Sequence, residues 1–106
     1  MQAPLKTNFI QMKIYITAII KSKPEYTAEV MRVLENMVAQ TRQETACIQY
    51  DLHRSIDDKN LFVFYEIWES QQGLNLHNEQ PYIQEFGRLA DEKLQEKPSI
   101  YLLEKI

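Results

Sequence analysis

The stretch that decides the fold is LFVFYEIWESQQGLNLH, residues 61–77. All eight residues of Leu61–Trp68 except Glu66 are apolar or aromatic, a pattern typical of a strand that is covered on both faces. Ser70 then offers a hydroxyl that caps a helix, and His77 ends the first turns of that helix. One strand and the helix after it therefore bring a carboxylate, an indole and an imidazole to the same neighbourhood.

The rest of the chain predicts three more strands and two more helices. β-branched and aromatic residues dominate Phe9–Ile20, while Cys47–Ile56 and Ser99–Ile106 alternate in side-chain character, so all three are predicted strands. One helix is predicted from Pro24 to about Thr45 and another from Pro81, because apolar residues recur three and four positions apart. The two apolar stripes are Val30, Val33, Leu34, Met37, Val38 and Thr41, then Tyr82, Ile83, Phe86, Leu89, Ala90 and Leu94.

The order of these elements predicts an α+β fold. The polar residues 57–60 form a hairpin turn into the central strand, which gives the order strand, helix, strand, strand, helix, strand. Two right-handed crossovers place both helices on one face of a four-stranded antiparallel sheet, the ferredoxin-like βαββαβ arrangement. We expect one domain over residues 12–106 and an N-terminal extension, residues 1–11, that begins as a disordered lead-in.

The central strand also predicts an oligomer. If both helices lie on one face, nothing in the chain covers the other, yet the strand carries large apolar side chains on both faces. One row is Leu61, Val63, Tyr65 and Ile67, and the other is Phe62, Phe64 and Trp68. An apolar patch of this kind marks an interface. We therefore expect a homodimer in which two sheets pack face to face about a twofold axis.

Composition excludes several classes of partner and location. The chain has 106 residues, 44% of them apolar and 25% charged, with a net charge of −3 and its Lys and Arg residues spread out. This balance argues against a nucleic-acid or membrane partner. The single cysteine, Cys47, fits a reducing compartment, and no stretch resembles a signal peptide or a membrane span. We expect a cytoplasmic protein.

Common cofactor and metal motifs are missing from the sequence. His53 and His77 lie on different predicted elements, and no HExxH or CxxC spacing occurs, so no metal site is expected. With glycine only at Gly73 and Gly87, neither GxGxxG nor a phosphate-binding loop is possible.

A pocket is predicted between the sheet and the helices. Its expected walls are Trp68, Tyr82 and Phe86, with His77 as the group that binds or deprotonates a flat phenolic or enolic molecule. The alternative is that His77 only caps its helix or hydrogen-bonds inside the fold. Glu66 has two readings as well, because a carboxylate in an apolar strand must be paired, hydrated or neutral. It either makes a structural ion pair with Arg54 or Lys13, or a hydrogen bond at the pocket edge, or it acts as an acid or base.

The stretch FVFYEIWESQQGLNLHNEQPYIQEF resembles the signature of the antibiotic biosynthesis monooxygenase domain family. The matching features are Glu-x-Trp at the end of an aromatic strand, a following serine, a histidine nine residues after the Trp, a proline four residues later and a closing Phe. In this chain they are Glu66, Trp68, Ser70, His77, Pro81 and Phe86. The resemblance extends more weakly over residues 13–103.

This resemblance implies a dimeric α/β barrel that oxidises a quinol-like or enolisable small molecule with O₂ and without a cofactor. His77 would be the catalytic base, and Trp68, Tyr82, Phe86 and Glu66 would bind substrate. An isomerase of a small phosphorylated dione signal and a non-catalytic binding module remain alternatives. The haem-degrading branch is disfavoured, because it needs a histidine near Gly87 and a tryptophan at His77.

Overall fold

The computed structural model describes residues 12–106, so the predicted extension and the beginning of the strand predicted from Phe9 lie outside the described part. One antiparallel sheet has the strand order β2-β3-β1-β4. Its strands are β1 Ile14–Lys21, β2 Cys47–Arg54, β3 Leu61–Trp68 and β4 Ser99–Leu103. The helices are the 3-10 helix η1 Pro24–Tyr26, then α2 Thr27–Thr41, α3 Gln71–Asn78 and α4 Pro81–Lys93. This order confirms the predicted α+β ferredoxin-like fold.

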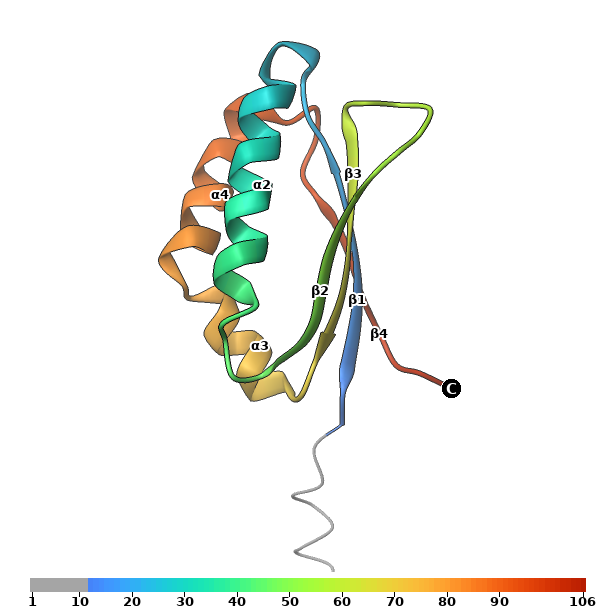
Figure 1. Ribbon diagram of the computed structural model, residues 1–106, viewed down its shortest axis with the longest axis vertical. Helices are drawn as coiled ribbons and strands as arrows, with labels where there is room; N and C mark the ends of the chain where they lie inside the picture. Colours follow the sequence, from blue (N-terminus) through green and yellow to red (C-terminus); the bar gives the residue numbers. More distant parts are fainter. Residues whose placement is uncertain (1–11) are drawn as a thin grey trace, which may run out of the picture.

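The molecule has two layers. The helices α2, α3 and α4 lie on one side of the sheet, and within residues 12–106 no helix covers the other side (Figure 1). No helix in this range has the length and apolar character that crossing a membrane requires.

Alternation along β3 divides its side chains between the two faces. The row toward the helices is buried and consists of Phe62, Phe64, Glu66 and Trp68. Across the ladder, Ile16 of β1 pairs with Glu66 and Tyr50 of β2 pairs with it on the other side, so these neighbours face the helices too. The core is therefore the space between this row and the apolar stripe of α2, whose buried members are Val30, Leu34, Met37 and Thr41.

Some element boundaries and the register of one strand differ from the sequence-based prediction. The helix predicted to about Thr45 ends at Thr41, where the chain enters a turn and the Glu44 amide donates to the Thr41 carbonyl oxygen. The last strand ends at Leu103 instead of Ile106. In β2 the register shifts between Cys47 and Gln49, so Ile48 is 47% exposed and does not share the buried side of Tyr50. A bulge of this kind cannot be read from alternation alone, because the extra residue breaks the period of two.

Replacing each of the two glycines with alanine is predicted to change stability in opposite directions. A Cβ at Gly73 would overlap the Cβ of Ala46, whereas a Cβ at Gly87 meets nothing within 4 Å. Gly73→Ala should therefore lower the free energy of unfolding by about 1–3 kcal/mol through overpacking. Gly87→Ala, also within a helix, should raise it by about 0.5–1 kcal/mol. Urea unfolding of both variants measures this, and a Gly73→Ala protein as stable as the wild type would contradict the close contact.

Candidate active site

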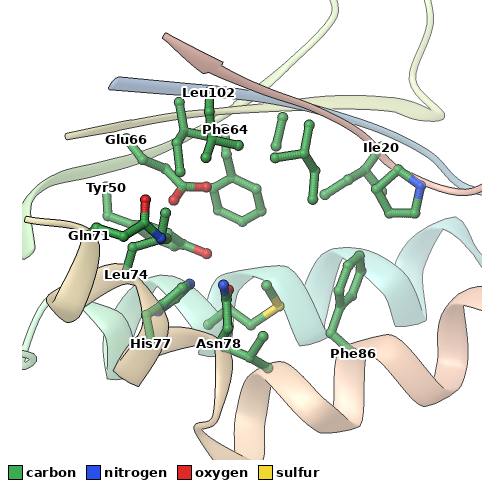
Figure 2. Close-up of a pocket in the computed structure, with 16 residues that line it drawn as sticks. Ile20, Tyr50, Phe64, Glu66, Gln71, Leu74, His77, Asn78, Phe86 and Leu102 are labelled. Atoms are coloured by element: carbon green, nitrogen blue, oxygen red, sulfur yellow. The ribbon is translucent and has the colours of Figure 1, made fainter. Parts of the chain in front are cut away.

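A cavity of about 320 Å³ lies between the sheet and the helices. Figure 2 shows its walls, with β-sheet side chains on one side and side chains of α3 and α4 on the other. Sixteen residues line it, and most are apolar: Ile16, Ala18, Ile20, Met37, Phe64, Leu74, Ile83, Phe86, Pro98, Ile100 and Leu102. A cavity of this size and character is typical of a site for a small organic molecule.

The polar lining is gathered at one end of the cavity. It consists of Tyr50, Glu66, Gln71, His77 and Asn78. Figure 2 shows these side chains converging from the sheet and from α3, while Ile20 and Phe86 lie at the other end. Within the described residues, no lysine or arginine lines the cavity. The cavity therefore suits an uncharged molecule with an apolar body and a polar edge.

The beginning of α3 fixes where its polar side chains point. Ser70 caps the helix, because its Oγ accepts a hydrogen bond of 3.1 Å from the Gly73 amide. Gly73 allows the helix to lie directly against Ala46. This anchoring holds the last turn of α3, with His77 and Asn78, over the sheet.

His77 has a fixed tautomer and a buried ring. Its Nδ1 donates to Oε2 of Glu44 at 2.9 Å, which leaves Nε2 with the free electron pair. The imidazole is 4% exposed and its centroid lies 4.4 Å from the Trp68 ring. Burial lowers the pKa of His77 below its ordinary value, although the hydrogen bond and charge of Glu44 oppose this shift. His77 is therefore neutral at physiological pH and able to accept a proton.

Glu44 is a site residue that the sequence analysis did not identify. It lies in the turn between α2 and β2, and Oε2 of its carboxylate accepts from both His77 Nδ1 and the Tyr82 hydroxyl. The contact with His77 joins residues 33 positions apart. No local pattern distinguishes Glu44, because its neighbours in the turn, Gln43 and Thr45, are polar as well.

Glu66 also lies at the polar end of the cavity. Its Oε1 accepts a hydrogen bond of 2.8 Å from Trp68 Nε1, and the side chain is almost fully buried. Burial raises the pKa of Glu66 to about 7, with the Trp68 hydrogen bond opposing the shift and the Glu44 charge adding to it. The suggested ion pair with Arg54 or Lys13 is not formed, and among residues 12–106 the hydrogen-bond partner of the carboxyl group is the indole.

Some of the predicted site residues line the cavity, and others lie behind its wall. Phe86 lines the cavity, as do His77 and Glu66. Trp68 is fully buried behind them, and Tyr82 reaches Glu44, so both support the lining without forming part of it. The lining residues Tyr50, Gln71 and Asn78 were not predicted from the sequence. Asn78 could have been suspected as a lining residue, because it directly follows His77 in the sequence.

No three His, Cys, Asp or Glu side chains within residues 12–106 are grouped as ligands of a metal ion would be.

Comparisons with known proteins agree with this architecture. Residues 13–89 match the family model described as antibiotic biosynthesis monooxygenase. The candidate monooxygenase YcnE of Bacillus subtilis is 34% identical over 81 residues, which are 76% of this chain and 85% of that protein. The crystal structure of PA3566 from Pseudomonas aeruginosa has a TM-score of 0.85 and 29% identity, covering 92% of this chain and 97% of that chain.

A Synechocystis protein is 29% identical over 93 residues, which are 88% of this chain. The present chain spans only 63% of the length of that relative.

Proposed function

The chain belongs to the antibiotic biosynthesis monooxygenase family, and from that premise we propose that it oxidises a neutral quinol-like or enolisable molecule directly with O₂. The observation that carries this proposal is the asymmetry of the cavity. A neutral imidazole with a fixed tautomer and a buried carboxyl group lie at one end, and apolar walls form the other.

The proposed chemistry begins with a proton. His77 Nε2 removes a proton from the hydroxyl or the activated C–H group of the substrate, which gives an electron-rich anion. This anion supplies electrons to O₂. One oxygen atom enters the product and the other leaves as water, so a substrate SH₂ and O₂ give SO and H₂O. The apolar walls keep bulk water away from the anion and its oxygenated intermediate.

The lining argues against a phosphorylated substrate. A phosphate group needs a cationic side chain or several aimed amide donors, and the lining formed by residues 12–106 contains no lysine or arginine. The Glu44 carboxylate lies next to His77, which would repel a dianion at the polar end. Isomerisation of a phosphorylated dione is therefore less well supported than oxidation of a neutral molecule.

An oxygen-electrode screen tests the substrate class. The probes are 1,4-naphthohydroquinone, anthrone and the monophosphate ester of the naphthohydroquinone, each corrected for autoxidation without enzyme. We expect oxygen consumption with the two neutral probes and none above background with the phosphate ester. Mass spectrometry with ¹⁸O₂ should find one labelled atom in the product. Oxygen loss equal to the enzyme-free control for every neutral probe would refute the assignment.

We also infer that two copies of the chain pair through the uncovered face of the sheet. Eight apolar or aromatic side chains gather there: Tyr15, Ile19, Leu61, Val63, Tyr65, Ile67, Tyr101 and Leu103. Tyr101 is 53% exposed and Leu103 48% exposed in the single chain. At about 25 cal/mol per Å² of apolar surface, covering this face contributes several kcal/mol, and a twofold axis brings the same face of a second copy onto it.

A further inference from the structure

The two oxygen atoms of Glu66 have different surroundings. Oε1 is occupied by the Trp68 indole N–H. Oε2 has no hydrogen-bond partner within residues 12–106. In that range, Thr41 Oγ1 is the only unpartnered polar side-chain atom that is fully shielded from solvent. Oε2 is therefore not fully shielded. Since Glu66 lines the cavity, Oε2 is the atom that a bound molecule reaches.

This arrangement also decides which oxygen carries a proton when the carboxyl group is neutral. An indole N–H only donates, so the oxygen that it contacts must accept. The proton of a neutral Glu66 therefore lies on Oε2, and its O–H group is available to the cavity. A neutral carboxyl group donates a hydrogen bond, which an ionised carboxylate cannot do.

The groups that face Glu66 favour its protonated form up to about pH 7. Tyr50 and Cys47 on β2 carry pKa values that burial raises, Cys47 to about 11, so both stay uncharged. Glu44, beyond the end of α2, adds a negative charge, and His77 on α3 is neutral. On β1 and β4 the neighbouring side chains are Ile16 and Leu102. Within the described part of the chain, no cationic side chain therefore favours the ionised form.

Resting on the function proposed above, we propose that Glu66 is a second catalytic residue, a proton donor through Oε2 to the substrate oxygen while His77 acts as base. Glu66 and His77 both line the polar end of the cavity, one from the sheet and one from α3, so one flat molecule bound there reaches both. The pairing of a neutral acid with a neutral base allows a carbonyl compound to be enolised at this site.

The proposed step is balanced without an oxidant. The C–H bond next to a carbonyl breaks as His77 Nε2 gains the proton, and the electron pair becomes a carbon–carbon double bond. The carbonyl oxygen takes the proton from Glu66 Oε2, so the products are an enol, an imidazolium and a carboxylate. The enol either loses its hydroxyl proton, which gives the anion that reacts with O₂, or takes back a proton from solvent at carbon through His77. Enolisation can therefore be observed without oxygen.

Anaerobic deuterium exchange tests the role of Glu66. The probe is 2-tetralone, a flat neutral ketone, in D₂O buffers from pH 5.5 to 8.5, with exchange at its benzylic methylene followed by proton NMR. Wild-type exchange should fall as pH rises through about 7, because Glu66 loses its proton there. Glu66→Gln should be about 10- to 100-fold slower at pH 6, since an amide donates a hydrogen bond but no proton. Its rate should show no decline near pH 7.

Glu69→Gln is the matched control, because Glu69 is an exposed carboxylate just past the end of β3. It should keep the wild-type rate and pH profile. Wild-type exchange that is absent, or that increases through pH 7, would overturn the proton-donor role, and so would unchanged exchange in Glu66→Gln. Failure of the proposed oxidation looks different. In that case exchange depends on Glu66 but no oxygen is consumed.

Unfolding supplies a readout that needs no substrate. The unfolded chain ionises Glu66 near its ordinary value of 4.5, whereas the folded chain retains the proton to about pH 7. The folded state binds more protons between these values, so the wild type should lose stability relative to Glu66→Gln as pH rises from about 4.5 to about 7. A constant difference across this range would mean that Glu66 is ionised throughout, which would overturn the proposal.

Discussion

Replacing His77 with alanine is expected to lower kcat/KM for oxygen consumption by two to four orders of magnitude, about 3–5.5 kcal/mol of transition-state stabilisation. The imidazole is a neutral base in the cavity wall whose tautomer is set by Glu44, and alanine removes the group that takes the substrate proton. Oxygen uptake with 1,4-naphthohydroquinone measures the loss. His53→Ala serves as control, because His53 is exposed on β2 and does not line the cavity.

Glu44→Gln distinguishes a base that is positioned from one that merely fills space. The Glu44 carboxylate raises the pKa of His77 against the effect of burial, so its removal should lower that pKa further. The acidic limb of the rate profile should then move to lower pH, with kcat reduced by about tenfold or more because the tautomer is no longer fixed. An unchanged acidic limb together with full activity in His77→Ala would remove the proton-transfer role from this pair.

Tyr65→Lys is expected to prevent the proposed dimer from forming at micromolar concentration. Tyr65 lies in the middle of the uncovered face, where its cross-strand neighbour on β1 is Thr17 and the next pair along is Tyr15 and Ile67. A twofold pairing of sheets would bury two unpaired ammonium groups, one from each copy, which costs several kcal/mol. The dissociation constant should rise at least about 100-fold.

Sedimentation velocity measures this change directly. The wild type should sediment with about twice the 12.6 kDa mass of the chain, and Tyr65→Lys with that mass alone. Gln40→Lys adds the same charge to the exposed surface of α2, on the helical side, and should remain dimeric. A wild type that sediments as a single chain at micromolar concentration would show that the apolar face has another role.

The two proposed proton-transfer groups differ in how they are held. His77 is oriented by an ionisable partner from another segment, while the Glu66 carboxyl is held by Trp68, two residues away on the same strand. Both residues of the hydrogen bond that holds Glu66 therefore belong to β3. The His77 arrangement depends on the turn after α2 and on the contact between Gly73 and Ala46 that places α3.

Local patterns determined most of the architecture from the sequence alone. The aromatic run of β3 was predicted with its observed bounds, and Ser70 and Pro81 mark the beginnings of α3 and α4 as expected. These features depend on periodicity and on the backbone preferences of neighbouring residues, so they are visible in a few positions. The rows of β3 were also predicted correctly, because alternate residues of a strand must face opposite sides.

The tertiary structure alone decided the site. It placed Glu66 and Trp68 on the helical side of the sheet, brought Glu44 to His77 across 33 positions, and gave Tyr50, Gln71 and Asn78 places in the cavity wall. Glu66 and its indole partner Trp68 are only two residues apart, but the sequence could not indicate that both face the cavity and not the uncovered side of the sheet. Strands and helices arise from interactions between near neighbours, whereas hydrogen-bond partners and burial depend on which distant segments meet. The sequence thus determined the elements and their order, and folding determined the chemistry of the cavity.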